Sequence, residues 1–173
     1  LYTFSTENWK RPKKEINFLF SLLENFLLKK IDNIIKDKIK LKFIGDLNKL
    51  PPKLKLLLTK SEKKTSQFKK LKINIALNYG SKSEIIKSIK AINKKSLKVN
   101  EKNIEKNLLT NGTPDPDILI RTGNTQRLSN FLLWQLAYTE IFFEKKLWPD
   151  FKKNDFNKIL KKFKNLKRNF GAI

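Results

Sequence analysis

Short apolar runs alternate with longer segments of helical periodicity along this chain, and that alternation limits the fold more than any other feature. Four runs have the length and composition of strands, and each ends at a turn signal: residues 1–4, 40–45, 72–78 and 117–120. Strands that alternate with helices predict an α/β fold. We therefore expect a single domain over residues 1–173, with a mostly parallel central sheet flanked by helices.

The first helix is predicted after Pro12, because the apolar residues that follow are spaced for one helical face: Ile16, Leu19, Phe20, Leu23, Phe26 and Leu27. Four further segments have helical patterns: residues 51–64, 81–92, 130–138 and 155–166. In the second of these, Ser81 and Glu84 have the spacing of an N-terminal capping box.

Polar loops follow all four predicted strands, at residues 5–12, 45–52, 78–84 and 121–130. In a parallel sheet such loops emerge at the carboxyl edge, where open α/β folds bind their ligands. We therefore expect one shared edge. It would bring together Arg11, Arg121 and Arg127, which are distant in sequence.

The choice of arginine in these loops is itself informative. Only four of the 39 basic residues are arginine, and three of the four lie in the predicted edge loops. Lysine supplies a hydrated point charge, whereas the planar guanidinium of arginine holds a phosphate or carboxylate through two parallel hydrogen bonds. The pattern indicates either an anion bound in a fixed geometry or structural salt bridges to Asp and Glu, and the residues alone leave both open.

Composition excludes several kinds of chemistry. With no Cys and no His, the common zinc sites, thiol nucleophiles and imidazole bases are absent, and no glycine-rich nucleotide-binding loop is present. No apolar run approaches the length of a membrane span, so we expect a soluble, cytoplasmic protein. The formal charge of +23 suits an anionic partner, but the lysines are spread over helices as solvated faces, which argues against nucleic acid.

Six segments carry a family resemblance: LYTFSTENWKRP, FIGD, INIALNYG, RTGNTQRLSNFLLWQLAYTEIFF, LWPDF and RNFG. In this order they resemble the cis-prenyltransferases, in particular the bacterial undecaprenyl diphosphate synthases (isoprenyl transferases). The similarity runs from Leu1 to about Gly171. It implies condensation of isopentenyl diphosphate with an allylic diphosphate such as farnesyl diphosphate, giving a long polyprenyl diphosphate such as undecaprenyl diphosphate, with Mg²⁺ as cofactor.

The resemblance also assigns roles to residues. Arg121, Arg127 and Ser129 match the positions that hold isopentenyl diphosphate, and Glu140 matches a magnesium-linked carboxylate. Ser5 and Asn8 match catalytic positions that bond the substrate or a water that receives the proton. Trp9 and Arg11 match substrate-binding positions. Leu19, Leu22 and Leu23 match the wall of a tunnel for the growing chain, although ordinary core packing also explains such an apolar stripe.

The sequence departs from the family pattern in several places. Asn124 and Thr125 replace a usual Gly-Glu, and Lys82, Ser83 and Glu84 stand where Arg-Trp-Asp is common. The family's first strand and its Asp-Gly-Asn loop should precede Leu1, so we expect an N-terminally truncated chain that is inactive alone.

Two expectations concern partners. The family is typically a homodimer in which a C-terminal segment, here around Arg168, Phe170 and Gly171, reaches the partner's site. The lysine-rich surface also suits peripheral contact with anionic lipid, although no amphipathic anchor is evident. Two alternatives to an enzyme remain: a non-catalytic partner subunit of a cis-prenyltransferase, and a basic nucleic-acid-binding module.

Overall fold

The computed structural model describes residues 1–169 and divides into two compact units. The first unit covers residues 1–111 and the second begins at Gly112. Each unit has its own parallel strands, so the predicted α/β class with parallel pairing is confirmed. The predicted roles of Phe170 and Gly171 lie outside the described residues.

The first unit is built on a three-stranded parallel sheet of β1 (Tyr2–Ser5), β2 (Ile39–Ile44) and β3 (Leu71–Tyr79), in the order β1-β3-β2. β2 and β3 pair without interruption from Ile39 opposite Leu71 to Ile44 opposite Ala76. β1 pairs with β3 through two register irregularities. All three strands therefore end at the same edge, as the sequence predicted.

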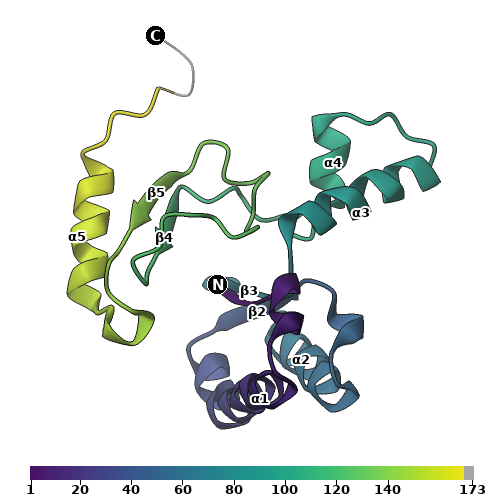
Figure 1. Ribbon diagram of the computed structural model, residues 1–173, viewed down its shortest axis with the longest axis horizontal. Helices are drawn as coiled ribbons and strands as arrows, with labels where there is room; N and C mark the ends of the chain where they lie inside the picture. Colours follow the sequence, from purple (N-terminus) through teal and green to yellow (C-terminus); the bar gives the residue numbers. More distant parts are fainter. Residues whose placement is uncertain (170–173) are drawn as a thin grey trace. The chain divides into compact units, whose positions relative to one another are not determined.

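Two long helices lie side by side in this unit, α1 (Lys13–Lys36) and α2 (Pro52–Thr65) (Figure 1). Each begins beside proline, which favours a first helical turn. The core forms where apolar residues at helical spacing on α1 and α2 meet the alternate inward residues of the sheet. Its helical members are Ile16, Phe20, Leu27, Leu54 and Leu58. Phe26, predicted on the buried face of α1, is instead 52% exposed.

Helix α2 also satisfies the free edge of the sheet. β2 is an edge strand, so the backbone N–H groups on its outer side have no neighbouring strand. The N–H of Leu41 donates to Oγ1 of Thr65 at 3.1 Å, and the N–H of Phe43 donates to Oε1 of Glu62 at 2.6 Å. Helical side chains thus take the place of a further strand.

The first unit ends in a helical pair, α3 (Ser81–Lys94) and α4 (Glu101–Asn107). The predicted capping box of Ser81 and Glu84 is wrong: the helix is capped by Gly80, without a side-chain cap bond. Glu84 is 4% exposed and instead accepts hydrogen bonds from the Tyr79 hydroxyl and from the N–H of Leu109. Two short 3-10 turns, η1 (Thr6–Lys10) and η2 (Leu47–Lys49), follow β1 and β2.

The second unit contains a parallel pair, β4 (Ile118–Arg121) and β5 (Glu140–Phe143), followed by η3 (Trp148–Asp150) and α5 (Lys153–Lys164) (Figure 1). The strands pair from Ile118 opposite Glu140 to Arg121 opposite Phe143. An ion pair of 2.7 Å between Lys146 Nζ and Asp155 Oδ1 ties the segment after β5 to α5.

The predicted helix over residues 130–138 is wrong. The segment is a series of turns, and Ser129, Asn130 and Leu132 have φ values of 50°, 61° and 44°. A right-handed helix needs negative φ, so these left-handed residues prevent one from forming at its start. Among residues 1–169, no helix is long and apolar enough to cross a membrane.

Candidate functional site

The carboxyl edge of the three-stranded sheet is organised around one buried side chain, Asn78, near the end of the central strand. Its Oδ1 accepts from Trp9 Nε1 at 2.8 Å, and its Nδ2 donates to the carbonyl oxygen of Asp46 at 2.7 Å. Asn78 thereby joins the loop after β1 to the loop after β2. The predicted convergence of the loops at residues 5–12, 45–52 and 78–84 is confirmed.

Close packing and charge reinforce this edge. At Gly45, φ is 135°, and a Cβ atom there would fall on the carbonyl oxygen of Leu77. The residue after Gly45, Asp46, forms an ion pair of 3.0 Å between its Oδ2 and Lys87 Nζ. The hydrogen bond from Lys87 is the main cause that lowers the pKa of the Asp46 carboxyl below its ordinary value. The edge therefore carries a fixed, ionised carboxylate.

The residues that resemble the family's catalytic stretch lie in the turn after β1. Asn8 Oδ1 accepts from the backbone N–H of Ser5 at 2.8 Å, so part of its hydrogen-bonding capacity holds the turn. The indole of Trp9 packs edge-on against Phe4 and Phe20, with ring centroids 5.4 and 5.8 Å away. Because Trp9 Nε1 is bonded to Asn78, the ring presents an apolar surface rather than a donor.

Arg11 pairs with an acidic neighbour. Its Nη1 lies 2.7 Å from Glu15 Oε1, one helical turn further on, and both side chains are 46% exposed. Such exposed pairs contribute about 0–1 kcal/mol, so the pair would open easily for a better anion. Its predicted convergence with Arg121 and Arg127 stays a prediction, because those residues belong to the other unit.

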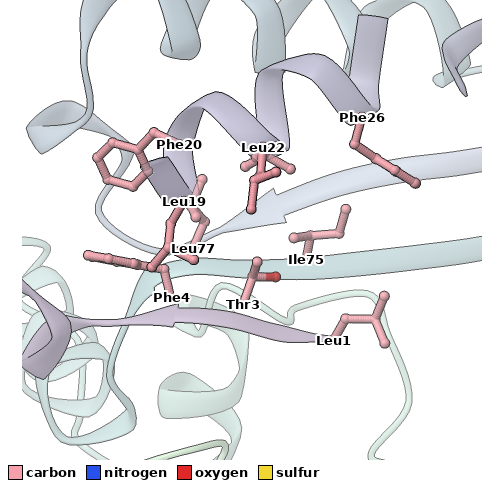
Figure 2. A pocket seen from close by; sticks show the side chains of 10 residues that line it. Leu1, Thr3, Phe4, Leu19, Phe20, Leu22, Phe26, Ile75 and Leu77 are labelled. Carbon is pink, nitrogen blue, oxygen red and sulfur yellow. The ribbon is translucent and has the colours of Figure 1, made fainter. Parts of the chain in front are cut away.

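An apolar cavity of about 340 Å³ lies beneath α1, between that helix and strands β1 and β3 (Figure 2). This volume falls within the range of ligand pockets, roughly 300–1,000 Å³. The residues predicted for the tunnel wall, Leu19, Leu22 and Leu23, all line it. The other lining residues are Leu1, Thr3, Phe4, Phe20, Phe26, Ile75 and Leu77. Phe4 and Phe20 also contact Trp9, so the cavity adjoins the turn that carries Ser5 and Asn8.

In the second unit, the loop after β4 carries the two arginines of the RTGNTQRLSN segment. Arg121 Nη1 donates to Ser129 Oγ at 3.0 Å, which closes the loop across eight residues. Arg127 is exposed, and within residues 1–169 it has neither an ion pair nor a hydrogen bond. Neither guanidinium is paired with a carboxylate in the described part of the chain. Within residues 1–169, the salt-bridge explanation therefore fits Arg11 but neither of these two arginines.

Backbone contacts fix the start of this loop. The N–H of Gly123 donates to the carbonyl oxygen of Lys146 at 2.7 Å, and the N–H of Asn124 donates to that of Glu144 at 3.1 Å. Asn124 has a φ of 53°, a left-handed conformation that Asn tolerates better than most residues. The Asn that replaces a usual Gly therefore suits its backbone.

Glu140 lies at the other end of the β4–β5 pair from Arg121, three residue positions along the strands, or roughly 10 Å. Its Oε1 forms an ion pair of 3.6 Å with Arg168 Nε. The structure thus brings Arg121 and Ser129 together and leaves Glu140 with Arg168. Among residues 1–169, no group of three or more acidic residues is arranged to hold a metal ion.

The sequence did not predict three features: the role of Asn78 at the sheet edge, and the contacts of Arg168 with Asp117 and with Glu140. A polar residue directly after a run of buried apolar residues was the available signal for Asn78. For Arg168, the signal was its status as the fourth arginine of a lysine-rich chain.

Known proteins match this chain over nearly its whole length. The family model described as "Putative undecaprenyl diphosphate synthase" matches residues 1–171. An isoprenyl transferase from Prochlorococcus marinus is 47% identical over the full chain, and one from Oceanobacillus iheyensis is 44% identical. The chain spans 66% of the length of the first relative and 71% of the second.

Two solved structures share the fold. A "probable undecaprenyl diphosphate synthase" from Campylobacter jejuni is 44% identical, with a TM-score of 0.94 over 99% of this chain and 82% of its own. A lavandulyl diphosphate synthase from Lavandula x intermedia, in complex with dimethylallyl diphosphate, is 32% identical, with a TM-score of 0.92 over 99% of this chain and 77% of its own. These likenesses confirm the predicted fold class. The boundaries of one domain over residues 1–173 stay a prediction.

Proposed function

The chain belongs to the prenyltransferase family of undecaprenyl diphosphate synthases, and from that premise we propose that it serves cis-prenyl chain elongation. The reaction condenses isopentenyl diphosphate with an allylic diphosphate such as farnesyl diphosphate. A carbon–carbon bond forms between the allylic C1 and the terminal carbon of the isopentenyl double bond. The allylic diphosphate departs, and a proton leaves the isopentenyl C2, which creates the new double bond.

Arg121, Arg127 and Ser129 hold the diphosphate of the isopentenyl unit in this proposal. The supporting observation is that, among residues 1–169, the guanidinium of Arg121 bonds to Ser129 Oγ at 3.0 Å and to no carboxylate, while the exposed Arg127 side chain has no partner. Two guanidinium groups without carboxylate partners keep most of their N–H donors for an anion. Each charge-assisted bond to phosphate contributes about 1.5–3 kcal/mol, and a fixed diphosphate orients the double bond for attack.

The growing hydrocarbon chain occupies the cavity lined by Leu19, Leu22 and Leu23. Support comes from its apolar lining and its volume of about 340 Å³. Each methylene removed from water contributes about 0.8 kcal/mol, so the cavity would retain an apolar tail between additions. Trp9, which packs against Phe4 and Phe20 of the lining, contributes an apolar wall beside the reacting groups.

Ser5 and Asn8 hydrogen-bond the substrate or a water that receives the departing proton. Their support is positional: both lie in the turn at the carboxyl edge of the sheet. Asn8 Oδ1 already accepts from the N–H of Ser5 at 2.8 Å, which holds the two residues together. Arg11, whose pair with Glu15 is exposed, contributes a further cationic contact to substrate.

Glu140 would hold Mg²⁺, and the ion would neutralise charge on the departing diphosphate. A carboxylate oxygen suits this ion, which usually takes one or two carboxylates together with substrate phosphate oxygens. The fit is supported by the position of the Arg168 guanidinium, a cation that contacts Glu140 Oε1 at 3.6 Å. The remaining ligands would come from substrate and water.

Three broader features belong to the same proposal. The protein acts in the cytoplasm as a homodimer, and its lysine-rich surface makes peripheral contact with anionic lipid, to which an insoluble product can be delivered.

Isothermal titration of the chain with isopentenyl diphosphate tests the diphosphate assignment. Arg127→Ala and Arg121→Ala should each weaken binding at least about tenfold, because each removes charge-assisted bonds. Lys145→Ala is the matched control: it removes one exposed positive charge of the same unit and should change affinity less than about twofold. Equal losses for all three variants would mean that net charge alone attracts the ligand, and the assignment would fail.

A further inference from the structure

The fourth arginine, Arg168, makes more side-chain contacts than Arg121 or Arg127 in the loop after β4. Its Nη1 lies 2.7 Å from Asp117 Oδ1, its Nε lies 3.6 Å from Glu140 Oε1, and its Nη2 donates to the carbonyl oxygen of Tyr138 at 2.9 Å. Its guanidinium carbon also lies 5.3 Å from the centre of the Phe163 ring. One planar guanidinium thus meets two carboxylates, a carbonyl and an aromatic face.

These contacts explain why arginine stands here in a chain that otherwise uses lysine. An ammonium group is a compact point charge that cannot reach the same groups at once. The Arg168 side chain is only 18% exposed, whereas that of Glu140 is 37% exposed and that of Asp117 is 71% exposed. The arginine is therefore desolvated, and its position depends on the two carboxylates that face it.

The groups that receive Arg168 are held by strand pairing. Asp117 directly precedes β4, and Glu140 begins β5. The N–H of Glu140 donates to the carbonyl oxygen of Asp117 at 3.0 Å, and the hydroxyl of Thr139 donates to that of Pro116 at 2.6 Å. Arg168 itself follows α5 by four residues, so it attaches the C-terminal segment to this pair of strand ends.

We infer that Arg168 is a positioning residue for Glu140: it holds the carboxylate as a counter-ion in the metal-free chain and competes with the divalent cation for it. The inference rests on the proposed function, in which Glu140 holds the metal. Two cations at one carboxylate repel each other, so the guanidinium weakens metal binding at Glu140, and a bound metal in turn weakens the contact between Arg168 Nε and Glu140 Oε1.

The test measures Mn²⁺ affinity of the full chain by electron paramagnetic resonance, without substrate or turnover. Arg168→Ala should raise the affinity about tenfold, because it removes the competitor and its charge-assisted bonds. Arg168→Lys should give an intermediate affinity, since the charge remains and the fork is lost.

Two controls separate this inference from its premise. Lys167→Ala removes the neighbouring positive charge, which is exposed, and should leave Mn²⁺ affinity unchanged within about twofold. Glu140→Gln should lower the affinity in both the parent and the Arg168→Ala chain. If Glu140→Gln has no effect, the metal assignment fails and the inference falls with it. If Glu140→Gln acts but Arg168→Ala does not, only the competition is refuted.

A second measurement does not require the variants to fold. Hydrogen exchange of the backbone amides at residues 165–169 should accelerate when Mn²⁺ is added to the unchanged chain, because the segment loses its ion pair with Glu140. Protection that stays the same at saturating Mn²⁺, or no detectable binding at millimolar Mn²⁺, would overturn the inference.

Discussion

Trp9 and Asn78, which are 69 residues apart in sequence, are joined by a hydrogen bond of 2.8 Å from the indole Nε1–H to the amide Oδ1. Asn78 is 2% exposed and also donates to the carbonyl oxygen of Asp46. Its φ of 51° lies in the left-handed region, so backbone and side chain together fix the direction of the amide. The turn that carries Ser5 and Asn8 is therefore held from the central strand.

Removing this amide should destabilise the first unit. Asn78→Ala leaves the Trp9 donor and the Asp46 carbonyl without their partner, and we expect a loss of about 2–3 kcal/mol in the free energy of unfolding. Asn78→Gly loses the same bonds but accepts the positive φ, so it should be about 1 kcal/mol less destabilising than the alanine variant. Urea denaturation gives both values.

The indole N–H resonance of Trp9 reports on the bond directly and should shift upfield and exchange faster in both variants. Asn93→Ala, an exposed position on α3, is the control and should leave that resonance in place. An unchanged Trp9 signal in Asn78→Ala would contradict the role of this amide.

Gly45 should be far less replaceable than Gly112 or Gly123. Gly45→Ala would place a methyl group on the Leu77 carbonyl at a φ of 135°, and we expect a loss of about 3 kcal/mol or more, or failure to fold. Gly112 also has a positive φ, 74°, but nothing lies within 4 Å of a Cβ built there. Gly112→Ala should therefore lower the free energy of unfolding by only about 1 kcal/mol. Thermal unfolding of the two variants measures both losses. Equal losses would show that the close approach of Gly45 to the Leu77 carbonyl is unimportant.

The ion pair between Lys146 and Asp155 should make stability depend on pH. The hydrogen bond from Lys146, with a second from the backbone N–H of Lys152, lowers the pKa of the Asp155 carboxyl below its ordinary value of 3.8. A lowered folded-state pKa stabilises the protein above that ordinary value, and the contribution is lost as pH falls through the folded pKa.

Asp155→Asn should consequently be less stable than the parent chain at neutral pH, and the difference should vanish in strong acid. Asp115→Asn removes an exposed carboxylate and serves as the control for net charge. A difference for Asp155→Asn that stays constant down to strong acid would show that the pair does not act through its charge.

Filling the cavity should reduce its capacity for an apolar ligand. Leu23→Trp adds bulk to the lining, and we expect it to weaken binding of the neutral probe N-phenyl-1-naphthylamine about fivefold, through about 1 kcal/mol of lost apolar contact. Leu28→Trp lies on the same helix but is 59% exposed at a position outside the cavity, so it should not change binding. Fluorescence titration measures the affinity of each variant for the probe. Equal affinities for the two variants would show that the probe binds outside this cavity.

Strand positions and the long helices could be predicted because local signals and burial agree there. Residues 72–78 are bounded by turn signals and form part of β3, and the prolines before α1 and α2 mark where those helices begin. Sequence periodicity did not predict side-chain partners that depend on contacts between distant segments. Glu84 has the spacing of a capping residue, but a buried tyrosine hydroxyl and the N–H of Leu109 compete for its carboxylate.

The site was predictable to a similar degree. Resemblance indicated Arg121 and Ser129, and the structure brings them into contact. The partner of Glu140 could not be predicted, because the Arg168 contact spans 28 residues and depends on how α5 returns to the paired strands, which no local pattern encodes. Short α4 was also missed, since only Ile104 is buried within it.

Ser129, Asn130 and Leu132 hold left-handed torsions directly after the Arg127 loop. Most side chains disfavour that region, and β-branched ones most of all, so this bend narrows the substitutions the segment can accept regardless of what it binds. Drift toward valine, isoleucine or threonine at Asn130 or Leu132 would straighten the bend and carry the Ser129 hydroxyl away from Arg121. Directed evolution for heat tolerance should thus leave this stretch untouched while freely altering the lysine-covered helices around it.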